Sequence, residues 1–331
     1  MKSIDVNINP EFGIELVLAL PYAYWLHKNN KLGKVKTSKG MKPFYYFTDN
    51  VEETYNYRTI VNPEAGLTSL PNEWIYGNSK NSKLYSDSWK DWKNFYDLEK
   101  PCGILNYNEW ELPDYNEHYK NDEIKFEKPV VFISNRYNWE HGHEPVGYFD
   151  IKCLYDMFSY LTESGYTVIY KRPNNTEFPL DQNEIITSTN RFELKADVEG
   201  IGIISDYELT NYYEDVYLFD DVVTKYPQYT YNEVQLKLFA NTDGFIGMGG
   251  GSTLLLCLFQ KPTIAYYGRR MVESERKCFW VDEFGNKNIK NYHYMINPNL
   301  IPFIDLDGKD MTKNNYNNFL NLVKENFNET N

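Results

Sequence analysis

Short apolar runs alternate with longer amphipathic stretches through the second half of the chain. Residues 130–134 are apolar at almost every position, as expected for a strand buried on both faces. The stretch that follows carries apolar side chains at helical spacing, namely Ile151, Leu154, Tyr155, Phe158 and Leu161. Gly165 ends this predicted helix, and a second apolar run covers residues 166–170. This order predicts a strand, a helix and a strand joined as a βαβ unit.

The same alternation continues to the end of the chain. Residues 216–219 predict a strand, and residues 230–240 predict a helix that begins with a capping box of Thr230 and Glu233. The remaining elements are expected, in chain order, as a strand at 242–246, an apolar helix at 254–259, a strand at 263–267, a short strand or connector at 302–306 and a polar amphipathic helix at 311–327. The fold class is therefore α/β, with a doubly wound parallel sheet in this half.

The first half is less regular. Residues 3–9 predict a strand, and residues 16–27 predict a strongly apolar helix that is buried between layers. Pro21 within that helix marks either a kink or the true helix start. Residues 43–48, with the sequence PFYYFT, predict the next strand. Residues 51–124 predict short helices and loops that complete a smaller first domain.

The glycine run after the strand at 242–246 is the first candidate for chemistry. Gly249, Gly250 and Gly251 have no Cβ, so a ligand can lie against the backbone. Ser252 and Thr253 are good N-cap residues, and the amides at a helix start attract an anion such as a diphosphate. A flexible turn between strand and helix is the simpler alternative. The position of the run favours a ligand, because open α/β sheets bind ligands at the carboxyl ends of their strands.

Length, composition and charge narrow the class of protein. The 331 residues allow two α/β domains, for which we expect boundaries at 1–127, 128–310 and a C-terminal helix at 311–331. No apolar run approaches the roughly 20 residues of a membrane span. The first residues have no signal-peptide pattern, so a cytoplasmic location is expected. The formal charge of −13 argues against a nucleic-acid partner but allows a phosphate ligand held by a few local cations.

Neither the cysteines nor the histidines have the spacing of a metal site. The four cysteines are scattered without a CxxC pair, which fits a reduced protein in which Cys153 and Cys257 are small core residues. His141 and His143 form the one suggestive pair, but no third ligand is near in the sequence. Asp305-Leu306-Asp307 is better explained as a turn. We expect no metal and no cofactor beyond the co-substrate.

The loops that follow the predicted strands should converge at one edge of the sheet. They contain Asn135 and Arg136, then Lys171 and Arg172, then Asp220 and Asp221, and finally the glycine run. Cations and helix-start amides suit the phosphates of a nucleoside diphosphate, and carboxylates suit its ribose hydroxyls. Taken singly, an arginine in the position of Arg172 is more often a surface residue, and the aspartate pair is equally well explained as a loop cap. The combination predicts a donor-binding site.

The sequence resembles the GT-B glycosyltransferases, and in particular the heptosyltransferase and fucosyltransferase-like members. FGIELVLALPYAYWLHKNNKL, residues 12–32, is similar to their opening loop and helix. NTDGFIGMGGGSTLLLCLFQKPTIAYYG, residues 241–268, resembles their late donor-binding loop, where the diphosphate rests on a helix start. VIYKRP, residues 168–173, resembles the strand whose terminal basic residue neutralises the diphosphate. The likeness covers most of the chain as an order of elements and is specific at the first loop and the glycine loop.

The resemblance implies two Rossmann-like domains facing across a cleft, with a C-terminal helix that can cross back to the first domain. It assigns to Arg172 the neutralisation of the diphosphate and to Glu15 the role of catalytic base. The first loop departs from the family pattern, because it has a single glycine, Gly13, and Glu where Asp is usual. His143 is an alternative base, and Gly13 and His141 belong to the acceptor side. Glu15 is equally well explained as an acidic residue favoured by a helix start.

The expected function is transfer of a hexosyl or deoxyhexosyl group from a nucleotide-sugar donor to a hydroxyl of a glycan or glycolipid. A carboxylate base and a cation-bound diphosphate make a metal-independent, inverting reaction the natural expectation. A nucleotide-sugar epimerase and a non-catalytic polysaccharide-binding or assembly protein are the alternatives. No basic amphipathic helix stands out, so membrane contact is expected to be peripheral at most.

Overall fold

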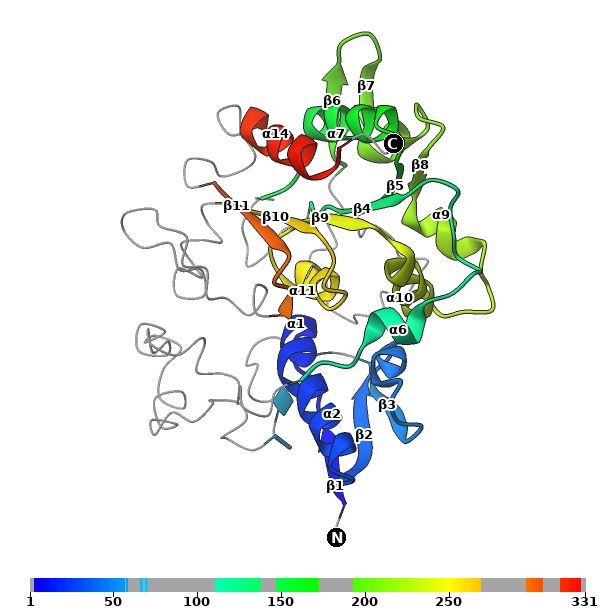
Figure 1. The fold of residues 1–331 in the computed structure, drawn as a ribbon, viewed down its shortest axis with the longest axis vertical. Coiled ribbons are helices and arrows are strands. Elements are labelled where there is room, and N and C mark those ends of the chain that lie inside the picture. Colours follow the sequence, from blue (N-terminus) through cyan, green and yellow to red (C-terminus); the bar gives the residue numbers. More distant parts are fainter. Residues whose placement is uncertain are drawn as a thin grey trace. The chain divides into compact units, whose positions relative to one another are not determined.

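The computed structural model describes most of the chain, namely residues 3–56, 58, 66–67, 69–70, 111–137, 147–172, 193–268, 296–305 and 316–328. These residues fall into two compact units, coloured along the sequence in Figure 1. The first unit contains the described residues up to Asp114 together with residues 296–298. The second unit contains the remaining described residues, from Tyr115 onwards.

The first unit contains a three-stranded parallel sheet in the order β1 (Ile4–Asn7), β2 (Leu32–Ser38) and β3 (Val51–Tyr55). The strand expected at residues 3–9 is confirmed. The strand expected at 43–48 is wrong, because η2 (Lys42–Tyr45) is a 3₁₀ turn with a proline at its start. The aromatic side chains of this segment pack on the neighbouring helix instead of alternating across a ladder. Phe44, for example, meets Phe12 edge to face at 5.8 Å.

One helical run follows β1 and has three parts, α1 (Phe12–Ile14), the π-helix η1 (Glu15–Ala19) and α2 (Leu20–Lys28). The Leu20 N–H donates to the Glu15 carbonyl, five residues earlier, so the helix widens at this point. Pro21 comes next; it has no N–H, and its ring would clash with the carbonyl four residues before it in a regular α-helix. The wider turn gives that ring room. The buried helix predicted from the apolar pattern is confirmed.

The second unit contains a six-stranded sheet whose neighbouring strands are all parallel. Its order is β11 (Leu300–Asp305), β10 (Thr263–Gly268), β9 (Gly244–Met248), β4 (Val130–Ser134), β5 (Thr167–Lys171) and β8 (Val216–Leu218). Every residue of β4, β5, β9 and β10 is buried, as expected for strands covered on both faces. The predicted doubly wound parallel sheet is confirmed.

Helices cover both faces of this sheet (Figure 1). One face is covered by α7 (Ile151–Glu163) and α14 (Tyr316–Asn326), and the other by α9 (Phe219–Thr224), α10 (Tyr231–Asn241) and α11 (Gly251–Cys257). A short helix, α6 (Tyr115–Tyr119), packs on α10. The C-terminal helix α14 packs on α7 of the same unit, where the Tyr316 hydroxyl donates to the Lys152 carbonyl at 3.1 Å. Cys153 and Cys257 are buried core residues, as the sequence predicts.

The stretch before β8, which the sequence pattern leaves irregular, contains a small antiparallel hairpin. Its strands are β6 (Lys195–Val198) and β7 (Gly202–Ser205), and it leads directly into α8 (Asp206–Thr210). Ser205 and Glu208 form a capping box at the start of α8. This cap fixes the position of Asp206, which is fully buried.

Candidate functional site

The order of the strands in the second unit reverses between β4 and β9. From β4 the chain continues to β5 and β8 on one side, and it then returns to β9, β10 and β11 on the other. Connections that leave in opposite directions open a crevice at the carboxyl ends of the two central strands, where α/β sheets bind their ligands. Asn135 and Arg136 follow β4 at this point, and the glycine turn follows β9.

The glycine turn has a conformation that depends on glycine. Gly250 has φ 127° and ψ −166°, in a region that residues with a Cβ essentially avoid. The Gly249 N–H donates to the Tyr266 carbonyl at 2.8 Å, so this amide is already used within the sheet. The helix α11 begins at Gly251 with Gly250 as its N-cap. The expectation that Ser252 and Thr253 cap the helix is therefore wrong, since both lie within its first turn.

The start of α11 is held firmly against the end of β9. The Thr253 hydroxyl is buried and donates to the Met248 carbonyl. A Cβ at Gly247 would lie 2.9 Å from Leu256 Cδ1 and 3.2 Å from Thr253 Oγ1, so helix and strand touch where this residue has no side chain. The amides of the first turn, Gly251 to Thr253, have no acceptor within the helix. This turn therefore presents fixed backbone donors to an anion.

Asn135 and Arg136 follow β4, the strand next to β9 in the sheet. The buried Asn135 amide donates to the Phe149 carbonyl at 2.9 Å and accepts from the Phe149 N–H at 2.9 Å, so it ties two chain segments together. The half-buried Arg136 donates from Nε to the Gly147 carbonyl at 3.4 Å. Gly147 in turn lies beside the end of β10, where a Cβ at Gly268 would meet its Cα at 3.7 Å. Arg136 is thus the cation placed directly at the strand reversal.

Arg172 follows β5, which β4 separates from the glycine turn. Its guanidinium is bound on two sides by Asp206, with Nη2 2.7 Å from Oδ1 and Nε paired to Oδ2. The ring of Tyr207 lies 4.6 Å from the guanidinium carbon. Burial acts to lower the pKa of Arg172, but the hydrogen bonds and charge of Asp206 outweigh it and raise that pKa. The guanidinium stays charged, and most of its charge is neutralised within the protein.

Asp206 belongs to a connected polar chain along the ends of β4 and β5. Its Oδ2 also accepts from the Tyr170 hydroxyl at 2.7 Å, and the Asn135 amide donates to that hydroxyl at 3.1 Å. Burial raises the pKa of Tyr170 well above its usual value, so the hydroxyl remains a donor. Sequence reasoning missed Asp206, Tyr170 and Tyr207. The one available signal was the Ser205–Glu208 capping box, which marks the helix start that carries Asp206.

Lys171 points to the opposite face of the sheet from Arg172. Its Nζ donates to Gln235 of α10 and lies 5.0 Å from the centre of the Tyr231 ring. Asp220 is on the same face, in the first turn of α9, with Asp221 exposed beside it. Burial raises the pKa of Asp220, and the charge of Lys171 counteracts this. The predicted donor residues therefore separate into two groups, one on each face of the sheet edge.

Glu15, in the first unit, is completely buried. Its Oε2 pairs with Arg58 Nη1 at 2.5 Å, while Oε1 accepts from the Tyr45 hydroxyl at 2.9 Å and from Thr37. Arg58 Nη1 also donates to the Pro10 carbonyl at 2.8 Å, which joins the loop after β1 to the helix. These contacts make Glu15 a structural anchor in this arrangement. Gly13 is buried beside it in α1.

The histidines named as acceptor-side or catalytic candidates, His141 and His143, lie outside the described residues. In the ranges that are described, no group of three or more His, Cys, Asp and Glu side chains gathers as a metal site would. None of the helices described is both long enough and apolar enough to cross a membrane.

Comparison with known proteins finds similarity in fold alone. No protein-family model and no curated protein matches the sequence. The heptosyltransferase WaaC of E. coli, solved with ADP, superposes with a TM-score of 0.54 at 11% identity, over 98% of this chain and all of that one. E. coli ADP-heptose LPS heptosyltransferase II (TM-score 0.49, 11% identity, 99% and 98% covered) and a family 9 glycosyltransferase from Veillonella parvula (0.46, 11%, 98% and 97%) also match. The likeness to WaaC supports the expected GT-B-like α/β fold, while the arrangement of two domains across a cleft stays a prediction.

Removing the charge of Glu15 should destabilise the first unit. Glu15→Gln keeps the shape of the side chain but leaves the Arg58 guanidinium buried without its counter-charge, and we expect a loss of about 3 kcal/mol in unfolding free energy. Glu52→Gln is the matched control, because it removes a solvent-screened surface pair with Lys34 and should cost far less stability. Urea unfolding of both variants measures the difference. Equal stability of Glu15→Gln and wild type would show that the ion pair is not an anchor.

A second prediction concerns the glycine turn. Gly250→Ala forces a Cβ into a backbone conformation that only glycine adopts easily, so we expect a loss of about 1–3 kcal/mol. Gly251→Ala, one residue later, places alanine at the first helical position and should be neutral within about 0.5 kcal/mol. Thermal and urea unfolding of the pair provide the measurement. A Gly250→Ala variant as stable as Gly251→Ala contradicts the geometry described.

Proposed function

We propose that this protein is a glycosyltransferase that moves a sugar from a nucleoside-diphosphate donor to a hydroxyl of a glycan or glycolipid, without a metal and with inversion. The observation that carries the proposal is the strand reversal at β4 and β9, because the start of α11 follows β9 and Arg136 follows the neighbouring strand β4. The fold shared with WaaC, whose structure contains ADP, supports the same class of ligand. In this arrangement the first unit binds the acceptor and the second unit binds the donor.

The donor diphosphate is assigned to the start of α11. The amides of Gly251, Ser252 and Thr253 and the positive end of the helix would hold its oxygens. Gly250 leaves the backbone open to a ligand because it has no side chain, whereas the N–H of Gly249 is already used within the sheet. Arg136 supplies the charge, since a guanidinium binds phosphate oxygens through two parallel hydrogen bonds. These groups would also stabilise the diphosphate as it leaves.

Arg172 has a different part in this proposal from the one that the sequence suggests. The pair with Asp206 uses the Nε–H and one N–H of Nη2, so two of the five N–H donors of Arg172 are already engaged in holding Asp206. We therefore assign to Arg172 and Asp206 the positioning of the polar chain that ends at Asn135, next to Arg136. Lys171 and Asp220, on the other face, are assigned to the nucleoside side of the donor.

The acceptor hydroxyl must lose a proton as the new bond forms, which calls for a general base. Glu15 and His143 are the candidates from the sequence, with His141 nearby on the acceptor side. A reaction through Glu15 requires the buried pair with Arg58 to open, because both carboxylate oxygens are engaged. The donor sugar is proposed as hexosyl or deoxyhexosyl, and the location as cytoplasmic, where nucleotide sugars are available.

Binding of a nucleoside diphosphate is the direct test. Thermal-shift measurements with UDP, GDP, ADP and CMP should show stabilisation by one of them, and a nucleotide at about 100 times its dissociation constant adds roughly 2.7 kcal/mol. Arg136→Met should weaken that binding about tenfold or more, because a charge-assisted contact to phosphate is lost. Lys225→Met removes an exposed cation at the C-cap of α9 and should leave the affinity unchanged.

The outcomes also separate the rival functions. No shift with any nucleotide contradicts sugar transfer and is what a non-catalytic binding protein would give. Conversion of a nucleotide sugar without any acceptor would identify an epimerase instead. A nucleotide-induced thermal shift that Arg136→Met does not weaken would show that the diphosphate binds away from the strand reversal.

A further inference from the structure

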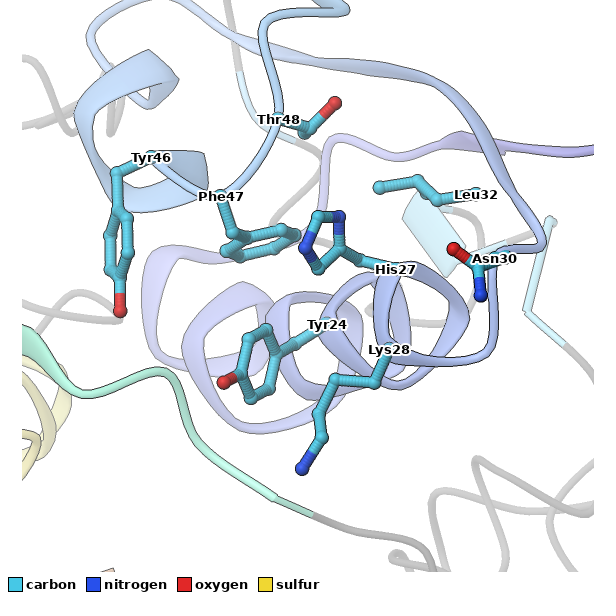
Figure 2. Close-up of a pocket in the computed structure, with 8 residues that line it drawn as sticks. All are labelled: Tyr24, His27, Lys28, Asn30, Leu32, Tyr46, Phe47 and Thr48. Carbon is cyan, nitrogen blue, oxygen red and sulfur yellow. The ribbon is translucent and has the colours of Figure 1, made fainter.

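A hollow of about 710 Å³ lies on the first unit, beside the second half of α2 (Figure 2). Its lining comes from α2, from the start of β2 and from the segment that leads into β3, namely Tyr24, His27, Lys28, Asn30, Leu32, Tyr46, Phe47 and Thr48. Figure 2 shows the rings of His27 and Phe47 at its centre, with Tyr24 and Tyr46 on one side and Asn30 and Thr48 on the other.

The topology of the first unit explains why the hollow exists. Parallel strands are usually joined by a helix that covers the sheet. Residues 39–50, which join β2 to β3, contain only the short 3₁₀ turn η2, so the flank of α2 is left partly uncovered. The hollow lies at the amino ends of β2 and β3. Glu15 is near the carboxyl ends, at the start of the helix, so the hollow is separate from the predicted catalytic loop.

The aromatic rings of the hollow hold one another in place. Phe47 meets the ring of Tyr24 at 5.1 Å and the ring of His27 at 5.3 Å. The rings of Tyr24 and His27 are nearly parallel, with an angle of 11° between their planes. Tyr24 and Phe47 are half-buried and His27 is exposed. The hollow therefore presents aromatic ring surface to solvent. Binding a ligand there should cost little side-chain entropy, because the rings already hold one another in place.

The polar groups of the hollow carry little net charge. Lys28 is the one lysine or arginine in the lining, and its Nζ is paired with Glu111 at 2.6 Å. The Tyr46 hydroxyl donates to the Asp114 carbonyl at 3.0 Å, and burial raises the pKa of Tyr46 to about 12, so the phenol is neutral at physiological pH. Asn30 and Thr48 add an amide and a hydroxyl. Such a lining offers no surplus charge to an anion and suits a neutral ligand.

We propose that this hollow binds a neutral saccharide unit of the acceptor glycan, at a distance from the catalytic loop. A pyranose ring has an apolar face of C–H groups that packs on aromatic rings, and a rim of hydroxyls that pairs with amides and hydroxyls. Tyr24 and Phe47 supply the first kind of surface, and Asn30 and Thr48 supply the second. The assignment to an acceptor rests on the proposed function, whereas saccharide binding itself can be tested independently.

A second contact of this kind would favour long acceptors over short ones. Two linked contacts on one chain raise the overall affinity because the second contact forms at a high effective concentration. The hollow would then act as a selector of glycan length and would take no part in bond making.

The test uses the full chain on an array of immobilised oligosaccharides, with neutral, sialylated and sulfated members. Wild type should bind neutral glycans. Phe47→Ala should reduce the signal roughly tenfold, as removal of a central aromatic contact does. Asn30→Gly should reduce it severalfold without a folding defect, because Asn30 has a φ of 54° that glycine adopts freely. Tyr212→Ala, at an exposed tyrosine of the second unit, should have no effect.

Each result has a defined meaning. Absence of neutral-glycan binding, binding confined to anionic glycans, or binding that both Asn30→Gly and Phe47→Ala leave intact would overturn the proposal. The thermal shift by a nucleoside diphosphate should be the same in all these variants. Absence of neutral-glycan binding by wild type, with that thermal shift retained, would remove this inference alone, whereas absence of the shift in wild type would remove the proposed function.

Discussion

The close contact between α11 and β9 is the constraint on which the candidate site depends. Gly247 lets the helix touch the strand, Thr253 closes the turn onto Met248, and Gly250 takes the backbone conformation that links them. Because this contact lies where the strand order reverses, the helix start opens into the crevice between β4 and β9. The proposed donor site would therefore be a product of backbone geometry, to which the side chain of Arg136 would add the charge.

Two of the charged residues that looked most reactive in the sequence are parts of buried ion pairs. Glu15 is held by Arg58 in the first unit, and Arg172 is held by Asp206 in the second. A buried pair contributes less to stability than its Coulomb attraction suggests, but losing one partner is costly. In both units the pair joins the end of a strand to a neighbouring segment. Such pairs give a sheet edge the rigidity that a ligand site needs, and they explain why charged residues occur there.

Much of the second unit follows from the apolar pattern alone. The runs at β4, β5, β9 and β10 are unambiguous, and Thr230 with Glu233 marks the start of α10 as predicted. The first unit is harder to predict. The lysines in β2 interrupt the apolar pattern of a strand, whereas the aromatic residues of PFYYFT have the composition of a strand but form a 3₁₀ turn. The partners of the buried charges could not be predicted from the sequence, since Arg58 is 43 residues from Glu15 and Asp206 is 34 residues from Arg172. Pairings at such separations depend on the fold and leave no local signal.

Amide hydrogen exchange with and without a bound nucleoside diphosphate would test most directly whether the ligand sits at the strand reversal. Amides that bind phosphate oxygens should exchange more slowly, so the amides of residues 251–253, which have no acceptor within the helix, should gain protection. The hairpin at residues 195–205 should exchange at an unchanged rate. Protection that appears elsewhere in the second unit, with none at residues 251–253 while the nucleotide is bound, would contradict the account.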